Sequence, residues 1–260
     1  MLGPMKPSPR HILITGASSG LGAALAQRYA APGVRLSLGA RRLDRLEEVA
    51  ATCRALGARV DIQRVDVEDK AATRAWVEAA DAEQPLDLMI ANAGISAGTG
   101  AGGEGEDQAR DIFAVNLVGV LNSIHPAIDQ MRARKAGQIA LVSSVAGYRG
   151  MPGAPAYSAS KAAVLAYGEA LRGSLGHDGI AISVICPGFV ETPMTAVNNF
   201  PMPFLMKADR AARIIARDLA RNRALITFPW QMRIIAWGLR ALPSGFMTRI
   251  LGRMPEKGGG

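Results

Sequence analysis

The sequence predicts a single α/β domain built on a parallel sheet, and three observations carry this prediction. Short apolar runs alternate with longer amphipathic segments from residue 11 onward. A glycine-rich turn follows the first run and opens the first helical segment. The chain has 260 residues, enough for one sizeable core of this kind. Such alternation is typical of a doubly wound sheet whose strands are buried under helices on both faces.

Seven apolar runs are predicted to be strands: His11–Thr15, Arg35–Ala40, Val60–Asp66, Leu86–Ala91, Gln138–Ser143, Ala181–Cys186 and Leu225–Phe228. Helices are expected between them, including one at Leu43–Leu56 and two that begin near Asp107 and Pro155. We expect residues 1–10 to be a flexible lead and residues 11–229 to form the domain. Residues 230–260 are predicted to be an amphipathic, basic extension of the same domain.

The net charge of +8 is confined to one end of the chain. Residues 1–206 hold 19 basic and 19 acidic side chains, whereas residues 207–260 hold 11 and 3. A nucleic-acid-binding face is therefore a poor explanation of the charge, and no nucleic-acid partner is expected. No amino-terminal stretch has the apolar length of a signal peptide or a membrane span. Cys53 and Cys186 lack metal-ligand spacing, so we expect reduced thiols, no metal site and a cytoplasmic protein.

Tyr157 and Lys161 are four residues apart in a predicted helix, so they share one face. A tyrosine with a pKa of about 10 is a poor proton donor or acceptor at neutral pH, but a nearby ammonium lowers that pKa. Tyr157 then becomes usable as a general acid or base. A lone pair of this spacing is more often a half-buried tyrosine beside a surface lysine, so the surrounding motifs decide.

Two polar residues accompany this pair. Ser144 follows the apolar run that begins at Ile139, which predicts a serine at the carboxyl end of a buried strand. Ligands of open α/β sheets bind at that edge. Asn116 lies in the apolar helical run Ile112–Val118, where a buried amide needs partners. It is either a structural hydrogen-bonding group or part of a polar relay.

The glycine-rich turn Thr15–Gly22 lies between a predicted strand and a predicted helix. Its glycines let the backbone turn and approach a pyrophosphate at the helix N-terminus, and it lacks the Lys-Ser/Thr ending of a triphosphate loop. The second strand ends at Ala40, followed by Arg41 and Arg42, where a carboxylate would favour NAD. Arginine suits a phosphate, so NADP(H) is predicted over NAD(H). The alternative is that both arginines only begin the next helix as solvated charges.

Taken in order, these motifs resemble the short-chain dehydrogenase/reductase family from about His11 to Thr192, which implies a Rossmann fold. The resemblance implies a catalytic set of Asn116, Ser144, Tyr157 and Lys161. Family members often have a second Asn before the Asn92–Gly94 triplet, and here that position is Ala91. The cofactor-binding residues that the resemblance implies are Gly16, Ser18, Ser19, Gly20, Leu21, Gly22, Arg41, Arg42, Asp66, Val67, Asn92, Ala93, Gly94, Tyr157, Lys161, Pro187, Gly188, Val190 and Thr192.

The implied activity is hydride transfer between NADP(H) and a carbonyl or secondary alcohol. In reduction, Tyr157 is expected to donate the proton and Ser144 to hydrogen-bond the carbonyl oxygen. Lys161 is expected to lower the Tyr157 pKa and hold the nicotinamide ribose, and Asn116 to position a water between Lys161 and bulk solvent. The alternative from another class is a catalytically idle NADP-binding sensor or scaffold. The intact set of four residues argues against it.

The resemblance also implies a substrate lid at residues 193–208. Pro193–Met206 is rich in methionine and phenylalanine, which predicts an apolar carbonyl or alcohol substrate unless these side chains fill the core. The glycine-rich, acidic segment Ser96–Asp107 is predicted to be a mobile loop near the active site. Relatives usually pair through the helices that begin here near Asp107 and Pro155, so we expect a homodimer or homotetramer.

The carboxyl-terminal extension suggests two basic amphipathic helices. In Trp230–Leu242, Arg233 and Arg240 share a face; after Pro243, Ser244 can cap a second helix with an apolar stripe. Such helices suit an anionic membrane surface, where each Lys or Arg contributes about 1 kcal/mol, but they are too short and charged to span a bilayer. The alternative, ranked ahead, is that they pack onto the domain or a partner subunit. We therefore expect a cytoplasmic enzyme with at most weak peripheral contact at the inner face of a membrane, through residues 230–254.

Overall fold

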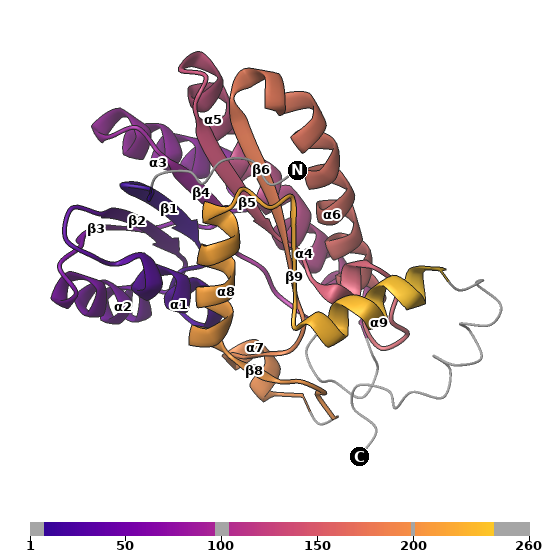
Figure 1. Cartoon of the computed structure of the whole chain (residues 1–260). Helices are drawn as coiled ribbons and strands as arrows, with labels where there is room; N and C mark the ends of the chain where they lie inside the picture. Colours follow the sequence, from indigo (N-terminus) through magenta and orange to yellow (C-terminus); the bar gives the residue numbers. More distant parts are fainter. Residues whose placement is uncertain (1–7, 97–103, 199–200, 242–260) are drawn as a thin grey trace.

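The strands form one parallel sheet of seven, in the order β3-β2-β1-β4-β5-β6-β9 (Figure 1). The computed structural model describes residues 8–96, 104–198 and 201–241. The strands are β1 (His11–Thr15), β2 (Arg35–Ala40), β3 (Arg59–Arg64), β4 (Leu88–Ala91), β5 (Gly137–Val142), β6 (Ile180–Pro187) and β9 (Leu225–Phe228). Two short strands, β7 (Val190–Glu191) and β8 (Met206–Lys207), pair separately. The predicted doubly wound α/β fold is confirmed.

Helices cover both faces of the sheet. One face packs against α1 (Gly20–Tyr29), α2 (Leu43–Ala55) and α8 (Ala208–Ala220). The other packs against α3 (Lys70–Glu83), α5 (Gly119–Ala133) and α6 (Pro155–Leu175). The remaining helices are α4 (Glu106–Phe113), α7 (Pro193–Ala196), α9 (Trp230–Ala241), the π-helix η1 (Ala114–Val118) and the 3₁₀ turns η2 (Val145–Gly147) and η3 (Gly176–Asp178).

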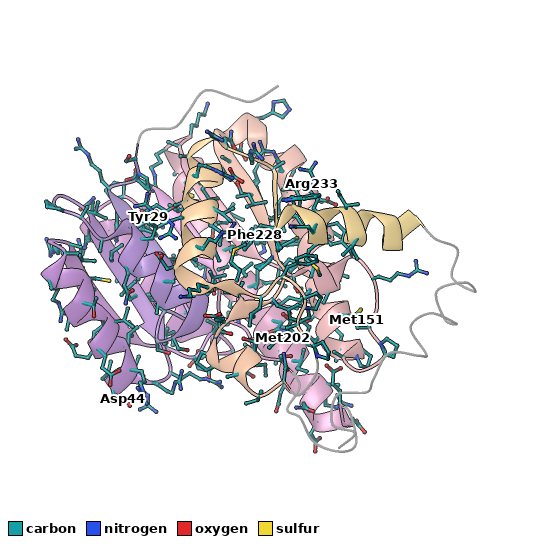
Figure 2. The ribbon with its side chains drawn as sticks, turned by 60° about the horizontal axis from the view of Figure 1, so that its bottom comes forward. Tyr29, Asp44, Met151, Met202, Phe228 and Arg233 are labelled. Atoms are coloured by element: carbon teal, nitrogen blue, oxygen red, sulfur yellow. The ribbon has the colours of Figure 1, made fainter. Side chains whose placement is uncertain are left out.

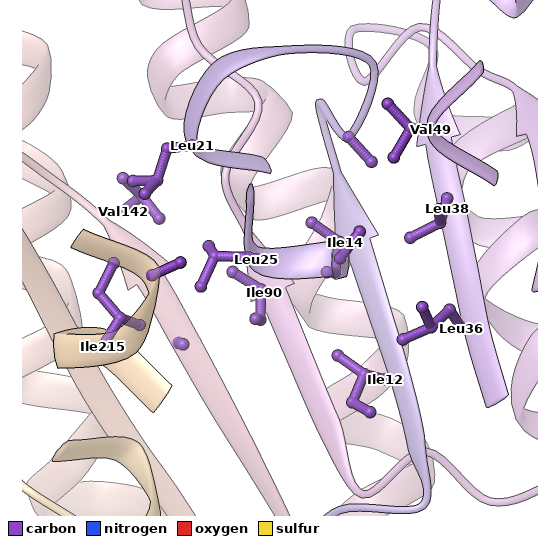
Figure 3. Close-up of a cluster of buried hydrophobic side chains, with 14 of the residues drawn as sticks. Ile12, Ile14, Leu21, Leu25, Leu36, Leu38, Val49, Ile90, Val142 and Ile215 are labelled. Atoms are coloured by element: carbon purple, nitrogen blue, oxygen red, sulfur yellow. The ribbon is translucent and has the colours of Figure 1, made fainter. Parts of the chain in front are cut away.

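The core follows from the alternation of side chains along each strand. On β1, Ile12 and Ile14 join the cluster under α1 and α8 (Figure 3). Leu13, between them, joins the cluster on the opposite face of the sheet. All three are fully buried, and burying a side chain of this size contributes roughly 1.5–3 kcal/mol. Cys53 and Cys186 are buried free thiols.

The sequence located the strands more accurately than their ends. β1, β2 and β9 have the predicted bounds, whereas β4 begins at Leu88 and not at Leu86. Leu86 is buried, but its N–H donates to Asp81 Oδ1 (2.9 Å) in the turn after α3, so burial there does not mean strand pairing. The two-residue strands β7 and β8 were not predicted, because they carry too few residues for a periodic signal.

The long helical run that follows the glycine-rich segment is irregular at its centre. Residues 106–133 form α4, the π-helix η1 and α5 in continuous succession. Among the described residues, this is the one run long and apolar enough to cross a bilayer, and 61% of its most apolar window is buried inside the domain, as in a core helix. Residues 97–103 of the predicted mobile loop and the predicted second helix beyond Pro243 lie outside the described residues.

The buried His11 generates a prediction about acid stability. Its Nδ1 lies 2.6 Å from Gln84 O and its Nε2 lies 2.8 Å from Ser37 Oγ, and burial lowers its pKa. Between this lowered pKa and the unfolded value near 6.5, the unfolded chain binds a proton that the native chain does not, so stability decreases as the pH falls. In thermal unfolding from pH 7.5 to 5, His11→Gln should weaken this decrease. His177→Gln, at an exposed histidine, should leave it unchanged; equal slopes in all three proteins would contradict the prediction.

Candidate active site

The carboxyl ends of the central strands open onto a cavity of about 510 Å³ (Figure 2 looks toward this edge). Turns after β1, β2, β4, β5 and β6 contribute to its wall, as expected for a parallel sheet. The predicted site residues on the wall are Gly16, Ser18, Ser19, Gly20, Leu21, Arg41, Arg42, Asp66, Val67, Asn92, Ala93, Gly94, Ser144, Tyr157, Lys161, Pro187, Gly188, Val190 and Thr192. Two predicted residues, Gly22 and Asn116, lie behind it.

Ser144, Tyr157 and Lys161 form one polar cluster. Ser144 caps η2 shortly after β5, and Tyr157 lies in the first turn of α6, close enough for the Ser144 side chain to lower its pKa. Lys161, one turn further along α6, lies with Nζ 5.8 Å from the centroid of the Tyr157 ring. Its Nζ donates to Val142 O (3.1 Å), the last residue of β5. The structure thus brings together three residues that the sequence places in two separate segments.

Burial changes the titration of this cluster in two directions. It raises the pKa of the Tyr157 phenol, an effect that the hydrogen bond from Ser144 opposes. It lowers the pKa of the Lys161 ammonium to about 8. The phenol therefore keeps its proton at neutral pH, in the form that a proton donor needs. The group that lowers the Tyr157 pKa here is Ser144; the contribution predicted for Lys161 stays a prediction.

Asn116 is buried in η1, and its side chain holds the backbone of Ile95. Oδ1 accepts from Ile95 N (2.8 Å), while Nδ2 donates to Ile95 O (2.9 Å) and Ser160 Oγ (3.2 Å). A Cβ on Gly94 would lie 3.1 Å from Asn116 Oδ1 and 3.3 Å from Lys161 Nζ. Of the two roles open to Asn116 from the sequence, structural hydrogen bonding is observed. A water relay through it stays a prediction.

The glycine turn is fixed by contacts to the end of β4. Gly16 and Gly20 have positive φ values of 65° and 56°, which favour glycine. Asn92 Nδ2 donates to Thr15 O (2.9 Å) and Gly16 O (3.1 Å), and Thr15 Oγ1 accepts from the N–H of Asn92 (3.0 Å). A Cβ on Gly22 would lie 2.3 Å from Gly16 O, so Gly22 permits close packing under the turn and does not line the cavity. The sequence did not indicate this role of Thr15.

Arg41 and Arg42, which follow β2, line the cavity. Arg42 Nη2 donates to Ser19 Oγ (3.0 Å) in the glycine turn. Arg41 Nη1 lies 3.8 Å from Asp66 Oδ2, in the turn after β3, which ends at Arg64 and not at Asp66 as predicted. Both line the cavity, although Arg42 is also the residue before the first turn of α2, as the alternative interpretation held.

Glu104 is a positioning residue that the sequence did not reveal. The helix α6 has no capping side chain at Ala154, and the Glu104 carboxylate accepts from the N–H of Ala156 and of Tyr157 (3.2 Å) instead. This carboxylate satisfies two unpaired donors at the positive end of the helix dipole. The sequence shows that α6 starts without a capping residue of its own. It does not show that the cap comes from a residue 52 positions earlier in the chain.

The segment after Thr192 divides its apolar side chains between cavity and core. Thr192 caps α7 through Thr195, and Met194 and Val197 line the cavity. Met206 packs in the core under α8. Some apolar side chains of this segment therefore face the cavity, as a lid would require, and others fill the core, as the alternative interpretation held. Phe204 and Leu205 are exposed, and Phe200 lies outside the described residues.

The helix α9 packs against β9 and η2, the turn that Ser144 caps. A Cβ on Gly188 would lie 3.1 Å from Met232 Cγ, so α9 supports the cavity wall from behind. Trp230, Ile234 and Ile235 remain exposed at 67%, 59% and 43%. This helix thus packs onto the domain along one side and presents apolar side chains on another.

Together, the fold and the site define a class: a dinucleotide-binding oxidoreductase with a Ser–Tyr–Lys cluster. The short chain dehydrogenase family matches residues 10–201. An uncharacterized oxidoreductase of Myxococcus xanthus is 40% identical over 238 residues, which cover 91% of this chain and 94% of that protein. The chain belongs to the short-chain dehydrogenase/reductase family and is an NAD(P)-dependent oxidoreductase acting on CH–OH or C=O groups.

Two solved structures share the fold. A short chain dehydrogenase from Mycobacterium paratuberculosis bound to NAD has a TM-score of 0.74 at 26% identity. A variant of actinorhodin polyketide ketoreductase with NADPH has a TM-score of 0.75, also at 26% identity. Each comparison covers 84% of this chain and 95% of the other. These structures hold different dinucleotides, so the preference of this chain has to be argued from its own residues.

The contact made by Glu104 generates a prediction. Glu104→Ala should lower the free energy of unfolding by about 1 kcal/mol, as for a lost helix cap. It should also lower kcat more than it changes KM, because the cap holds the turn that carries Tyr157. Glu106→Ala, at an exposed residue that pairs with Arg110, is the control and should not change kcat. Unchanged stability and unchanged kcat in Glu104→Ala would contradict the assignment.

Proposed function

We propose that the protein transfers a hydride between NADP(H) and the carbonyl or secondary alcohol of a lipophilic substrate. The observation that carries the proposal is the Ser144–Tyr157–Lys161 cluster on the wall of a dinucleotide-sized cavity. Gly16 and Gly94 let the glycine turn and the end of β4 pack closely against the protein's own atoms, and both residues line this cavity. The alternative of a catalytically idle sensor leaves this cluster without a role.

The catalytic roles follow from the protonation states. The bound nicotinamide supplies or accepts the hydride. In reduction, the protonated phenol of Tyr157 donates its proton to the substrate oxygen as negative charge develops there. Ser144 Oγ donates a hydrogen bond to the same oxygen and orients the carbonyl. The Lys161 ammonium stabilises the resulting phenolate and holds the nicotinamide ribose. Asn116 keeps the Ile95 backbone in place and, we propose, positions a water toward Lys161.

The preference for NADP(H) rests on Arg41 and Arg42. Two guanidinium groups stand where β2 ends, and Ala40 leaves no carboxylate at that position to repel a ribose phosphate. We propose that Asp66 contacts the adenine from the turn after β3 while it also pairs with Arg41. The glycine turn, Asn92–Gly94 and Pro187–Thr192 complete the proposed contacts to the cofactor.

The substrate class rests on the apolar part of the wall. Ile95, Met194 and Val197 line the cavity near the catalytic cluster, and methionine adapts to apolar ligands of varied shape. We propose residues 193–208 as the lid over this substrate. An apolar carbonyl or alcohol compound fits these residues better than a charged one.

For assembly, we propose a homodimer or homotetramer that uses the helical run 106–133. Phe113 and Val118 on this run are exposed at 37% and 46%, which supports a subunit contact there. Light scattering at micromolar concentration tests this assembly, and a monomeric mass would contradict it.

The proposed location is the cytoplasm, and the exposed apolar residues of α9 support weak peripheral contact with a membrane.

Replacing the proton donor tests the proposed chemistry. Tyr157→Phe should lower kcat for NADPH-dependent reduction of apolar ketones and aldehydes by roughly 100-fold or more, because the general acid is lost. The Kd for NADPH should change far less. Tyr167→Phe is a matched control, since Tyr167 bonds His125 away from the cavity. A Tyr157→Phe variant with native turnover would refute the catalytic assignment.

The cofactor preference is tested by removing one guanidinium. Arg41→Ala should weaken NADPH binding by about tenfold or more while it leaves NADH binding nearly unchanged, because only NADPH carries the ribose phosphate. The control is Arg45→Ala, an exposed arginine one turn along α2 that does not line the cavity. Calorimetry on both cofactors measures the effect. Equal affinity of the native protein for NADPH and NADH would remove the argument.

A further inference from the structure

A second cavity, of about 460 Å³, lies beside the edge strand β9. The last turns of α6, the turn between α8 and β9, and the first turn of α9 contribute to it. Its lining residues are Arg172, Asn222, Arg223, Ala224, Leu225, Thr227 and Arg233. Three of these seven are arginines and none is acidic, and no residue lines both this cavity and the cofactor cavity.

Arg172 is a partly buried cation held only by neutral acceptors. Its Nη1 donates to Ile182 O and to Asn222 Oδ1 (3.1 Å), and its Nη2 donates to Asn222 O (3.0 Å). No carboxylate in the described part of the chain lies within ion-pair distance of it, and burial lowers its pKa. A cation in this setting is destabilised unless an anion approaches it.

The other two guanidinium groups also retain unused donors. Arg223 Nε is buried without a hydrogen bond and lies 3.6 Å from Asp218 Oδ1. That carboxylate oxygen is already held by Arg217 at 2.9 Å. Arg233, labelled at the start of α9 in Figure 2, is exposed and has no ion pair within the described residues. Of the three guanidinium groups of the cavity, only Arg223 lies within ion-pair distance of a carboxylate in the described residues, and it shares that carboxylate with Arg217.

We propose that this cavity is a binding site for a phosphate group. Guanidinium groups present planar forks of donors that match phosphate oxygens, and converging arginines suit a multiply charged anion. The phosphate could belong to a free phosphate compound or to a lipid headgroup. Trp230, Arg233 and Ile234 share one face of α9 at spacings of three and four residues, so the cavity borders an exposed apolar stripe. The experiment separates these two sources.

The soluble arm uses protein saturated with NADPH, so that the cofactor cavity is occupied. Inorganic phosphate should bind in calorimetry and raise the unfolding temperature, whereas chloride at equal ionic strength should not. Arg233→Gln and Arg223→Gln should each weaken this binding by roughly tenfold or more. Arg221→Gln is the matched control: the same charge is removed from an exposed arginine beside Asn222 that does not line the cavity.

The lipid arm measures sedimentation of the same proteins with vesicles of phosphatidylcholine, alone and mixed with phosphatidic acid. Vesicle binding that is lost in Arg233→Gln, retained in Arg221→Gln and weakened in Trp230→Ala assigns the phosphate to a lipid. Binding of inorganic phosphate without vesicle binding assigns it to a soluble compound. The proposal is overturned if neither ligand binds, if Arg221→Gln loses as much as Arg233→Gln, or if inorganic phosphate does not bind and vesicle binding depends on Trp230 alone.

Discussion

The buried ammonium of Lys161 is the constraint on which the active site depends. The residue is 4% exposed, and the surrounding backbone is arranged to accept it. Nζ donates to Val142 O, and the Lys161 carbonyl accepts from Ser143 Oγ (2.7 Å). A Cβ on Gly147 would lie 2.8 Å from the Lys161 carbonyl carbon, so only glycine permits η2 to pack this closely on α6. The end of β5, η2 and α6 are therefore fixed relative to one another around one charged side chain.

This burial also changes the titration of the candidate catalytic residues. Removing Tyr157 and Lys161 from water disfavours the charged form of each, so burial moves their pKa values in opposite directions. The neutral phenol becomes easier to maintain and the ammonium easier to deprotonate. The pKa values of the two groups therefore lie further apart in the folded protein than in water, with the phenol the weaker acid of the pair. Desolvation prepares both residues before any ligand binds.

The positive charge of the carboxyl-terminal region has two different structural roles. Arg213 forms an exposed ion pair with Asp209 on α8, whereas Arg217 pairs with Asp218, whose side chain is buried. Arg223 and Arg233 instead converge with Arg172 of α6 on the cavity beside β9. Arginines of the same stretch of sequence therefore have two settings: some form ion pairs along α8, and others line the cavity beside β9. The separation follows from the turn after α8, which directs the chain back along β6.

Local sequence determined the sheet, the glycine turn and the candidate catalytic residues, because each depends on spacing within a few residues. Alternation predicted buried strands, the glycine-rich pattern between strand and helix predicted the turn, and the four-residue spacing placed Tyr157 and Lys161 on one face. Only the tertiary structure decided that Glu104 caps α6, that Asn116 holds Ile95 and that Thr15 clamps Asn92. These partners are 52, 21 and 77 residues apart, and no periodic pattern connects them. The same holds for desolvation of Lys161, since burial depends on what every surrounding element places against a side chain.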